Sequence, residues 1–284
     1  MILISDLYIQ EDFMHSDLIH QLQAIVDSSA DNDSNRTIAR YFLSHIMTLD
    51  SLSVQTIAGA CYASIATVSR FVRSLGYESF AQLKQITVHY RHSVNASTKD
   101  YLVELPYDDG DREAIDSYTA NITDSLMRFE KTVSVEQLDG VCRRIHDARD
   151  VALYGFYQPG LLAKQLQFLF LSIGRYTESY DLVEDHAERA RTMEPGDLAI
   201  FLSVDGNYVL GQGRQVIEQL KSRGVTLILL SQTRDPLIHA MFDEVVQLGT
   251  PDSKRAGYYK LQLCTELLFS RYMRLYSPDA PRRA

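Results

Sequence analysis

Residues 53–85 form the stretch that most constrains how this chain can fold. They read SVQTIAGACYASIATVSRFVRSLGYESFAQLKQ, with apolar side chains at the three- and four-residue spacing of amphipathic helices. One apolar face comprises Val54, Ile57, Ala58 and Cys61. A second apolar face comprises Val68, Phe71, Val72 and Leu75. The stretch therefore predicts two short helices joined by a tight turn.

The second of these helices has a defined start and end. Ser64 can cap its N-terminus, because the hydroxyl can accept an unpaired backbone N–H, and Gly76 suits its C-terminal end. The side chains left pointing outward are Ile65, Ala66, Thr67, Ser69, Arg70 and Arg73. Small and hydroxylated residues followed by cations suit a helix that lies in the DNA major groove. The same spacing also fits an ordinary helical hairpin with a solvated polar face.

Length and composition limit the classes of protein to which this chain can belong. A chain of 284 residues is long enough for two domains, and a hydrophobic fraction of 45% supports packed cores. No apolar run approaches the roughly 20 residues that span a bilayer. The first residues, MILISDLYIQEDF, lack the basic region of a secretory signal, so we expect a cytoplasmic protein.

The distribution of charge leaves room for a locally basic surface. The net charge of −9 argues against indiscriminate binding to polyanions. Salt screens charges beyond about 10 Å, however, so the local balance matters more than the total. Between residues 64 and 92 the acidic residue is Glu78, and the cations are Arg70, Arg73, Lys84 and Arg91.

The cysteines are too few and too widely spaced for a disulfide framework or a set of metal ligands. They are Cys61, Cys142 and Cys264. We expect reduced, buried thiols, and we expect neither a metal nor a cofactor.

Residues 1–92 carry apolar stripes at helical spacing and predict an all-α bundle, with the helix pair at about residues 53–76. The first stripe consists of Leu18, Leu22, Ile25 and Val26. A polar break at residues 27–35 predicts a loop. Residues 93–111 are polar and contain Pro106 and Gly110, and we expect a linker there.

Residues 112–284 show a different pattern, in which short apolar runs alternate with helical stripes. Strands are expected at 151–155, 175–179, 198–204, 226–231 and 244–249. Helices are expected at 113–131, 135–147, 160–173, 185–192, 209–223 and 258–275. Strands that are apolar throughout and separated by helices predict a parallel sheet covered on both faces. The second domain is thus predicted to be a doubly wound α/β domain, which binds ligands at the carboxyl ends of its strands.

Two strand-to-helix loops carry the candidate ligand-binding residues, at 155–160 and 203–208. The free N–H groups of a helix N-terminus below such a loop favour anions. Asp205 would repel a phosphate there unless a cation offsets its charge. Alternatively, both segments are simply turns that require glycine.

The helix pair and its surroundings resemble the DNA-binding domain of the RpiR family of bacterial transcriptional regulators. That family has a serine opening the recognition helix, a Thr-x-x-Arg-Phe core, a Leu-Gly-aromatic turn and a Phe-x-x-x-Lys helix. The matching residues here are Ser64, Thr67, Arg70, Phe71, Leu75, Gly76, Tyr77, Phe80 and Lys84. The second half resembles the sugar isomerase (SIS) domain that this family joins to the DNA-binding module.

The SIS-like half departs from the family pattern in both loops. Where the family has Gly-x-Gly-x-Ser, this chain has Gly155, Tyr157 and Pro159. In the Ser-x-Ser-Gly-x-Thr loop, Asp205 and Tyr208 replace a serine and a threonine. The resemblance implies an effector site made of Gly155, Tyr157, Gln158, Ser203, Asp205, Gly206, Asn207 and Tyr208. Because hydroxyls that hold a sugar phosphate are missing, a neutral or amine-bearing ligand, or a filled pocket, is expected instead.

A possible acid–base group follows the second predicted strand, at Glu184, Asp185 and His186. Sugar isomerases of this fold could place a catalytic group there. A solvated first helical turn is the interpretation that we prefer, and we expect a protein that is not an enzyme.

The resemblance implies a DNA-binding transcriptional regulator, of sugar or amino-sugar metabolism genes, with an effector or oligomerisation domain. Its partner is double-stranded operator DNA, contacted by Ser64, Ala66, Thr67, Ser69, Arg70, Arg73 and Lys84. Operator symmetry implies a homodimer or homotetramer. A SIS domain that only oligomerises, or a sugar-phosphate isomerase, are the alternative hypotheses.

Overall fold

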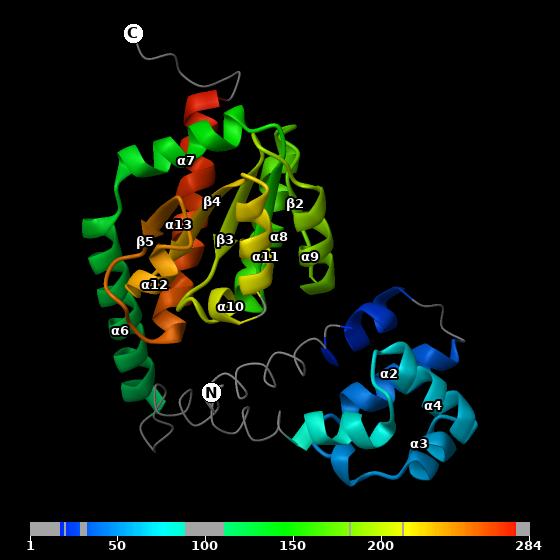
Figure 1. Cartoon of the computed structure of the whole chain (residues 1–284). Helices are drawn as coiled ribbons and strands as arrows, with labels where there is room; N and C mark the ends of the chain where they lie inside the picture. Colours follow the sequence, from blue (N-terminus) through cyan, green and yellow to red (C-terminus); the bar gives the residue numbers. More distant parts are fainter. Residues whose placement is uncertain are drawn as a thin grey trace. The chain divides into compact units, whose positions relative to one another are not determined.

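The chain forms two compact units, which are Met1–Tyr107, called here the helical unit, and Asp108–Ala284, called the α/β unit (Figure 1). The computed structural model describes residues 18–19, 21–28, 33–88, 111–181, 183–211 and 213–276. The predicted linker lies outside the described residues except for Asp111. The predicted domain bounds 1–92 and 112–284 stay predictions.

The helical unit is built from short helices with side-chain caps. Residues 21–28 and 80–88 are helical. Between them lie α2 (Ser34–Ser44), the 3-10 helix η1 (Leu49–Ser51), α3 (Val54–Ala60) and α4 (Ile65–Ser74). Asp33 caps α2 and Ser53 caps α3, in each case by accepting a backbone N–H. The polar break predicted at 27–35 is shorter than expected, because the helix continues through Ser28.

One apolar core holds the helical unit together. Its fully buried side chains include Leu18, Leu22, Ile38, Phe42, Ile57, Val68 and Leu83. Phe42 of α2 meets Phe71 of α4 edge to face, with ring centroids 5.6 Å apart. The predicted apolar faces of the helix pair are confirmed, since they lie in this core.

The α/β unit contains a five-stranded parallel sheet in the order β2-β1-β3-β4-β5. The strands are β1 (Val151–Gly155), β2 (Glu178–Ser179), β3 (Leu198–Leu202), β4 (Thr226–Ser231) and β5 (Glu244–Gln247). The longer helices are α6 (Asp111–Thr132), α7 (Val135–Asp147), α8 (Gln158–Ser172), α9 (Val183–Thr192), α11 (Gly213–Ser222) and α13 (Lys254–Tyr276). The chain order reverses between β1 and β3, and this switch point is where doubly wound sheets bind ligands.

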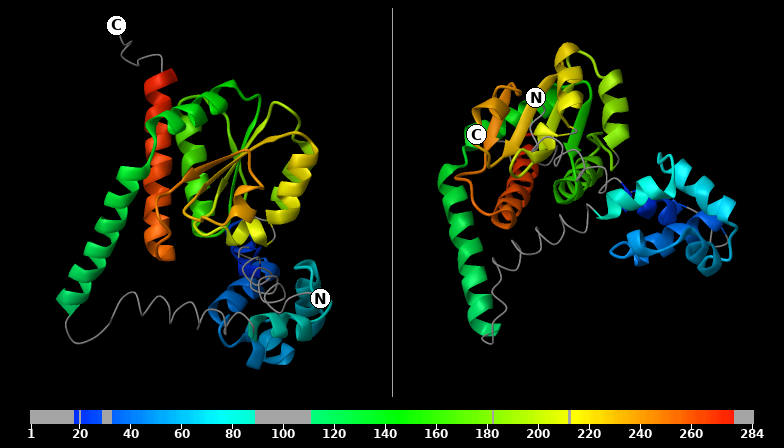
Figure 2. Two further views of the ribbon diagram at one scale, coloured as in Figure 1. Left: turned by 60° about the vertical axis from the view of Figure 1, so that its left-hand side comes forward. Right: turned by 60° about the horizontal axis from the view of Figure 1, so that its bottom comes forward.

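Helices cover both faces of the sheet, as Figures 1 and 2 show. Successive strand residues point to opposite faces. Val151 and Leu153 pack with α7, α8 and α13 in one core. On the other face, Tyr154 of β1 stacks on Phe201 of β3 at 4.7 Å, beside His186 of α9. The predicted fold class, a helical bundle followed by a doubly wound α/β domain, is confirmed.

The structure corrects several predicted elements. The strands predicted at 175–179 and 244–249 are shorter, because only β2 and the four residues of β5 pair with neighbours. The single helix predicted at 209–223 is two, α10 (Asn207–Leu210) and α11. The short helix α12 (Pro236–His239), capped by Asp235, was not predicted.

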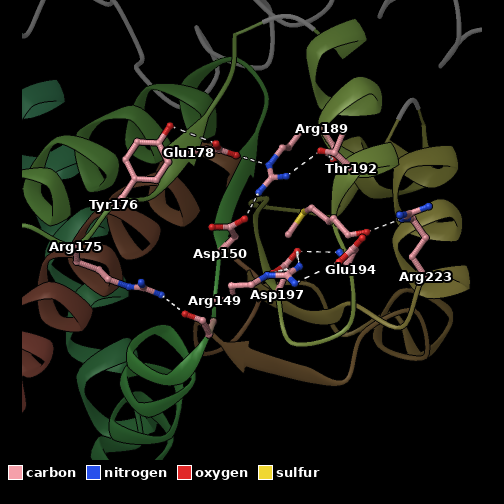
Figure 3. A network of polar contacts seen from close by, with 12 residues as sticks. Arg149, Asp150, Arg175, Tyr176, Glu178, Arg189, Thr192, Glu194, Asp197 and Arg223 are labelled. Carbon is pink, nitrogen blue, oxygen red and sulfur yellow. Dashed lines mark hydrogen bonds and ion pairs between the residues drawn. The ribbon is translucent and has the colours of Figure 1, made fainter.

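A network of ion pairs joins the segments that enter the sheet at its amino edge (Figure 3). Arg149 bonds both carboxylate oxygens of Asp197, at 3.0 and 3.1 Å. Arg189 forms ion pairs with Asp150 and with Glu178. The network therefore ties the starts of β1 and β3 to β2 and α9, at the edge opposite to the candidate ligand loops.

The cysteines agree with the expectation from sequence. Cys61, Cys142 and Cys264 are buried and free, which confirms the predicted thiols. Burial raises the pKa of Cys142 and Cys264 to about 12, so both stay protonated. Within the part of the chain that the structure describes, no helix combines the length and apolar character needed to cross a membrane.

Candidate nucleic-acid interface and effector loops

Helix α4 is fixed at both ends by local interactions. Ser64 accepts the backbone N–H of Thr67 at 3.1 Å and caps the start of the helix, as predicted. Gly76 ends it at φ +89°, a left-handed conformation that favours glycine. Val68 and Val72 are fully buried on the side facing the core. The opposite side of α4 is consequently held in one orientation toward solvent.

The outward face of α4 is exposed and positively charged. Ile65 and Ala66 are exposed in its first turn, and Arg70 and Arg73 are exposed further along. Among the residues that the structure describes, no side chain pairs with either guanidinium. Two arginines three residues apart on a helix lie on the same side and can reach neighbouring phosphates. Ser69 lies beside them and is half-buried.

Three of the predicted DNA-contacting side chains already have partners within the helical unit. The hydroxyls of Ser64 and Thr67 are 2.9 Å apart, and the former also caps the helix. The ammonium of Lys84 lies 5.2 Å from the centre of the Phe80 ring. These contacts hold the side chains in place, and each keeps polar atoms that can still meet a phosphate.

The two effector loops lie next to each other because β1 pairs with β3. The turn at residues 155–160 is very tight: a Cβ on Gly155 would lie 2.6 Å from the carbonyl oxygen of Pro159. Glycine is therefore required at this position. The simpler alternative, a turn that requires glycine, therefore holds for Gly155.

Tyr157 lies where the family pattern has a glycine, and it keeps a glycine-like backbone. Its φ and ψ are 57° and −129°, which side-chain-bearing residues rarely adopt. The ring is 42% exposed and contacts Phe156 edge to face. The backbone here is thus one that glycine adopts readily, and Tyr157 adds a large, partly exposed aromatic side chain to the loop.

The second loop closes on itself. Gly206 adopts φ +81° and donates its backbone N–H to the hydroxyl of Ser203 at 3.1 Å. A Cβ on Gly206 would lie 2.3 Å from Ile238, so this glycine is also required. A backbone N–H that could bind an anion is therefore already satisfied within the loop. Asn207, by contrast, is exposed.

Tyr208 points into the protein interior and pairs with His186. Its side chain is 5% exposed, and its hydroxyl lies 2.7 Å from Nδ1 of His186. Nε2 of His186 lies 2.9 Å from the carbonyl oxygen of Tyr180, which can only accept, so Nε2 carries the hydrogen. In the neutral imidazole Nδ1 then accepts from Tyr208. Burial raises the pKa of Tyr208 well above its ordinary value.

The burial of His186 corrects an expectation from sequence. The side chain is 0% exposed, so the preferred interpretation of a solvated helical turn was wrong for this residue. Tyr208 packs closely enough on Gly213 that a Cβ there would lie 2.8 Å from the ring. The helix predicted at 209–223 is interrupted at Gly211, whose ψ of −123° is not helical. Tyr208 meets the rings of Phe156, His186 and Phe201 in one aromatic cluster.

Asp205 has polar partners that sequence alone did not reveal. Its carboxylate accepts from the side-chain amide of Gln232 at 2.8 Å, and Gln232 also bonds the backbone of Asp252. The buried ammonium of Lys260 bonds the Asp252 carboxylate at 3.0 Å. Burial lowers the pKa of Lys260, and the bond and charge of Asp252 oppose this effect only in part. Lys260 is thus paired with Asp252, and among the described residues no cation forms an ion pair with Asp205, whose negative charge stays at the loop.

The residues missed from sequence lie far from the loops along the chain. Gln232 follows β4, and Asp252 follows β5. Lys260 lies in α13, and no local sequence pattern distinguishes any of the three. Tyr62 was also missed, although an aromatic residue inside a tight helix-to-helix turn is a visible signal. In the described ranges, no group of three or more His, Cys, Asp or Glu side chains is placed to hold a metal ion.

Comparison with known proteins identifies the family. Residues 19–90 match the model of the helix-turn-helix domain of the rpiR family. Over 208 residues the chain is 26% identical to an uncharacterised HTH-type transcriptional regulator of Caldanaerobacter subterraneus, covering 72% of this chain and 71% of that protein. Over 205 residues it is 20% identical to the HTH-type transcriptional regulator RpiR of Escherichia coli, covering 72% and 68%. The helix-turn-helix domain of this chain therefore belongs to the rpiR family.

This chain is a transcriptional regulator in which a helix-turn-helix domain is followed by a doubly wound α/β domain. It is 22% identical over 226 residues to the regulator HexR of Pseudomonas aeruginosa, covering 78% of this chain and 76% of that protein. Its fold resembles that of Vibrio vulnificus NanR, solved in complex with ManNAc-6P, with a TM-score of 0.51 and 17% identity. That likeness covers 91% of this chain and 92% of the NanR chain, and it concerns the fold alone.

Proposed function

We propose that this regulator reads operator DNA with the outward face of α4. The observation that supports the proposal best is the pair Arg70 and Arg73, which are exposed one to two turns beyond the start of α4. Base edges would meet Ala66 and Ser69, and phosphates would meet the two arginines. Ser64, Thr67 and Lys84 complete the proposed contact set.

The salt dependence of DNA binding tests this assignment. We expect Arg70→Ala to weaken operator binding and to reduce the slope of log K against log salt by about one. Arg214→Ala is the matched control, because this exposed arginine lies in the α/β unit and pairs only with Glu218 among the described residues. An unchanged salt slope in the first variant would remove Arg70 from the contact set.

We also propose that the effector loops bind a neutral or amine-bearing metabolite rather than a phosphate. The N–H of Gly206 and the hydroxyl of Tyr208 are engaged inside the protein. Asp205 and the exposed Asn207 remain as polar groups at the loop, and a carboxylate favours an amine over an anion. The ligand would change DNA affinity only if it binds one arrangement of the two recognition helices better than another.

A thermal-shift series distinguishes the possible roles of the loops. We expect a saturable shift with an amino sugar such as glucosamine, and none with its 6-phosphate or with ManNAc-6P. A shift with the phosphates alone would contradict the proposal. No shift with any metabolite would favour a domain that only oligomerises, a second candidate that the buried Tyr208 supports.

We propose a homodimer formed through α8. This helix exposes three large apolar side chains, Leu161 at 64%, Phe168 at 71% and Leu171 at 44%. Such a face is usually covered, and a second copy would bring the two recognition helices that successive major grooves require. Phe168→Glu should shift the protein to monomer in sedimentation, whereas Ile115→Glu on α6, a second exposed apolar residue, should not. A homotetramer would need a further interface.

We infer that the α/β unit does not catalyse isomerisation. Both ring nitrogens of His186, the acid–base candidate, are hydrogen-bonded inside the protein. A general base needs access to its substrate. Turnover of a sugar phosphate that is abolished by His186→Ala would overturn this inference.

We propose that the protein acts in the cytoplasm, because a regulator that binds operator DNA must reach the chromosome.

A further inference from the structure

Tyr62 is a fully exposed aromatic residue held in a strained backbone conformation between α3 and α4. Its φ is +51°, in the left-handed region, and its side chain is 99% exposed. Among the residues that the structure describes, its hydroxyl has no hydrogen-bond partner and its ring no aromatic neighbour. A tyrosine exposed in this way contributes nothing to the core of the helical unit.

The turn itself calls for glycine at this position. Ala63 donates its N–H to the carbonyl of Ala58 at 2.9 Å, and Tyr62 donates to Gly59 at 3.3 Å. This is a Schellman motif, in which the left-handed residue is usually glycine.

Helix α4 ends in the same motif, and there the left-handed position is glycine. Tyr77 donates its N–H to Val72 at 3.3 Å, and Gly76 at φ +89° donates to Arg73 at 3.0 Å. Two copies of one motif in one unit thus differ at the equivalent residue. The requirements of the turn therefore do not explain Tyr62.

The position of Tyr62 next to α4 gives a better reason for a tyrosine at this residue. It lies two residues before Ser64, the N-cap of α4, and next to the exposed first turn. In helix-turn-helix proteins the start of the second helix approaches the bases, and the preceding helix crosses the phosphate backbone. A side chain that projects from the turn between them lies near that backbone.

We propose that Tyr62 donates a hydrogen bond from its hydroxyl to an operator phosphate and so sets the position of α4 in the groove. The inference rests on the proposed DNA contact of α4. A phenol can donate one hydrogen bond, and tyrosine hydroxyls are among the groups that contact DNA phosphates. Because tyrosine is uncharged, the contact releases fewer counterions than an arginine contact does.

Two substitutions in the full-length protein test the role of Tyr62. The DNA is a duplex enriched from a random library by the wild-type protein, with a random duplex beside it. Tyr62→Phe keeps the ring and the backbone strain and should weaken binding to both duplexes about tenfold, with the salt slope unchanged. Tyr62→Gly should weaken binding at least as much while α3 and α4 become more protected in hydrogen exchange. Tyr176→Phe, in the α/β unit, is the control and should bind as the wild type does.

The opposite results are equally clear. Wild-type affinity in Tyr62→Phe would overturn the proposal, because the hydroxyl would then make no contact. Lower protection of α3 and α4 in Tyr62→Gly would make Tyr62 a structural residue and would also overturn it. If the wild-type protein enriches no duplex, the DNA-binding proposal itself fails, and Arg70→Ala then shows no effect either.

Discussion

Each unit of this regulator places a tyrosine where the backbone favours glycine, and the two tyrosines differ in their surroundings. Tyr62, in the turn before α4, is 99% exposed, while Tyr157, in the first effector loop, is 42% exposed and contacts Phe156. Strained positions of this kind are usually kept at functional sites. The tyrosine of the helical unit is thus almost fully exposed, whereas the tyrosine of the α/β unit packs partly on a neighbouring ring.

The same contrast holds for the other site residues. On α4 the arginines face solvent, whereas in the second effector loop the hydroxyl of Tyr208 and the N–H of Gly206 face inward. Two domains that keep their folds can therefore differ in whether the binding groups stay available. The following predictions test this contrast, beginning with the largest expected effect.

Tyr208→Thr should destabilise the α/β unit by about 4 kcal/mol, because it removes a buried ring and leaves His186 without its partner. Chemical unfolding followed by circular dichroism measures the change. Restoring the threonine of the family pattern would therefore damage the core. Tyr208→Phe keeps the ring and should cost only about 1 kcal/mol. Equal stability of wild type and Tyr208→Thr would show that the residue does not belong to the core.

Asp197→Asn should cost the α/β unit about 2 kcal/mol at neutral pH, since Asp197 is buried and receives two hydrogen bonds from Arg149. Burial alone would raise the pKa of Asp197, but the bonds and charge of Arg149 and the N–H of Glu194 together lower it. The stabilisation is therefore present above about pH 4, the unfolded pKa, and is lost as the pH falls through the folded pKa.

The test measures the free energy of unfolding of the wild type and of Asp197→Asn across this range of pH. The two curves should converge as the pH falls. A difference between them that stays constant down to pH 2 would mean that the carboxylate charge contributes nothing. Glu194→Gln is a control with a smaller expected effect, because Glu194 is exposed and its pair with Arg149 lies in solvent.

Tyr157→Gly should stabilise the α/β unit by about 1 kcal/mol, because the backbone strain is released and the side chain that is removed is 42% exposed. Thermal unfolding is the measurement. The same variant opens the first effector loop, so combining it with Asp205→Ser tests whether phosphate affinity returns without harm to the core. Binding heat with a sugar phosphate in calorimetry would show that these two residues exclude it.

Ser69→Ala should change operator affinity by less than tenfold and leave stability nearly unchanged, since the half-buried Ser69 lies on the outward side of α4. Its effect should differ between operator variants, because a base contact carries sequence information and a phosphate contact does not. Equal losses on all duplexes would reassign Ser69 to the DNA backbone.

Local patterns were sufficient for α4, for its outward face and for the central strands of the sheet. The spacing of Val68, Phe71 and Val72 defines the buried side of that helix, and Ser64 and Gly76 mark its ends, all within 13 residues of sequence. The strand at 226–231 was predicted with its exact bounds, because a fully buried strand is a continuous apolar run between turns.

The chemistry of the effector loops, by contrast, was decided by tertiary structure. His186 and Tyr208 lie 22 residues apart, and Asp205 meets Gln232 across 27 residues, so their hydrogen bonds depend on how strands and helices pack. A sequence shows that a polar side chain is present, but its burial and its partner come from the fold. The sequence by itself thus determined that a helical bundle precedes an α/β domain, and which residues lie on the outward face of α4. The sheet and its helices bring distant segments together, and only this packing decides which loop hydroxyls remain free for a ligand.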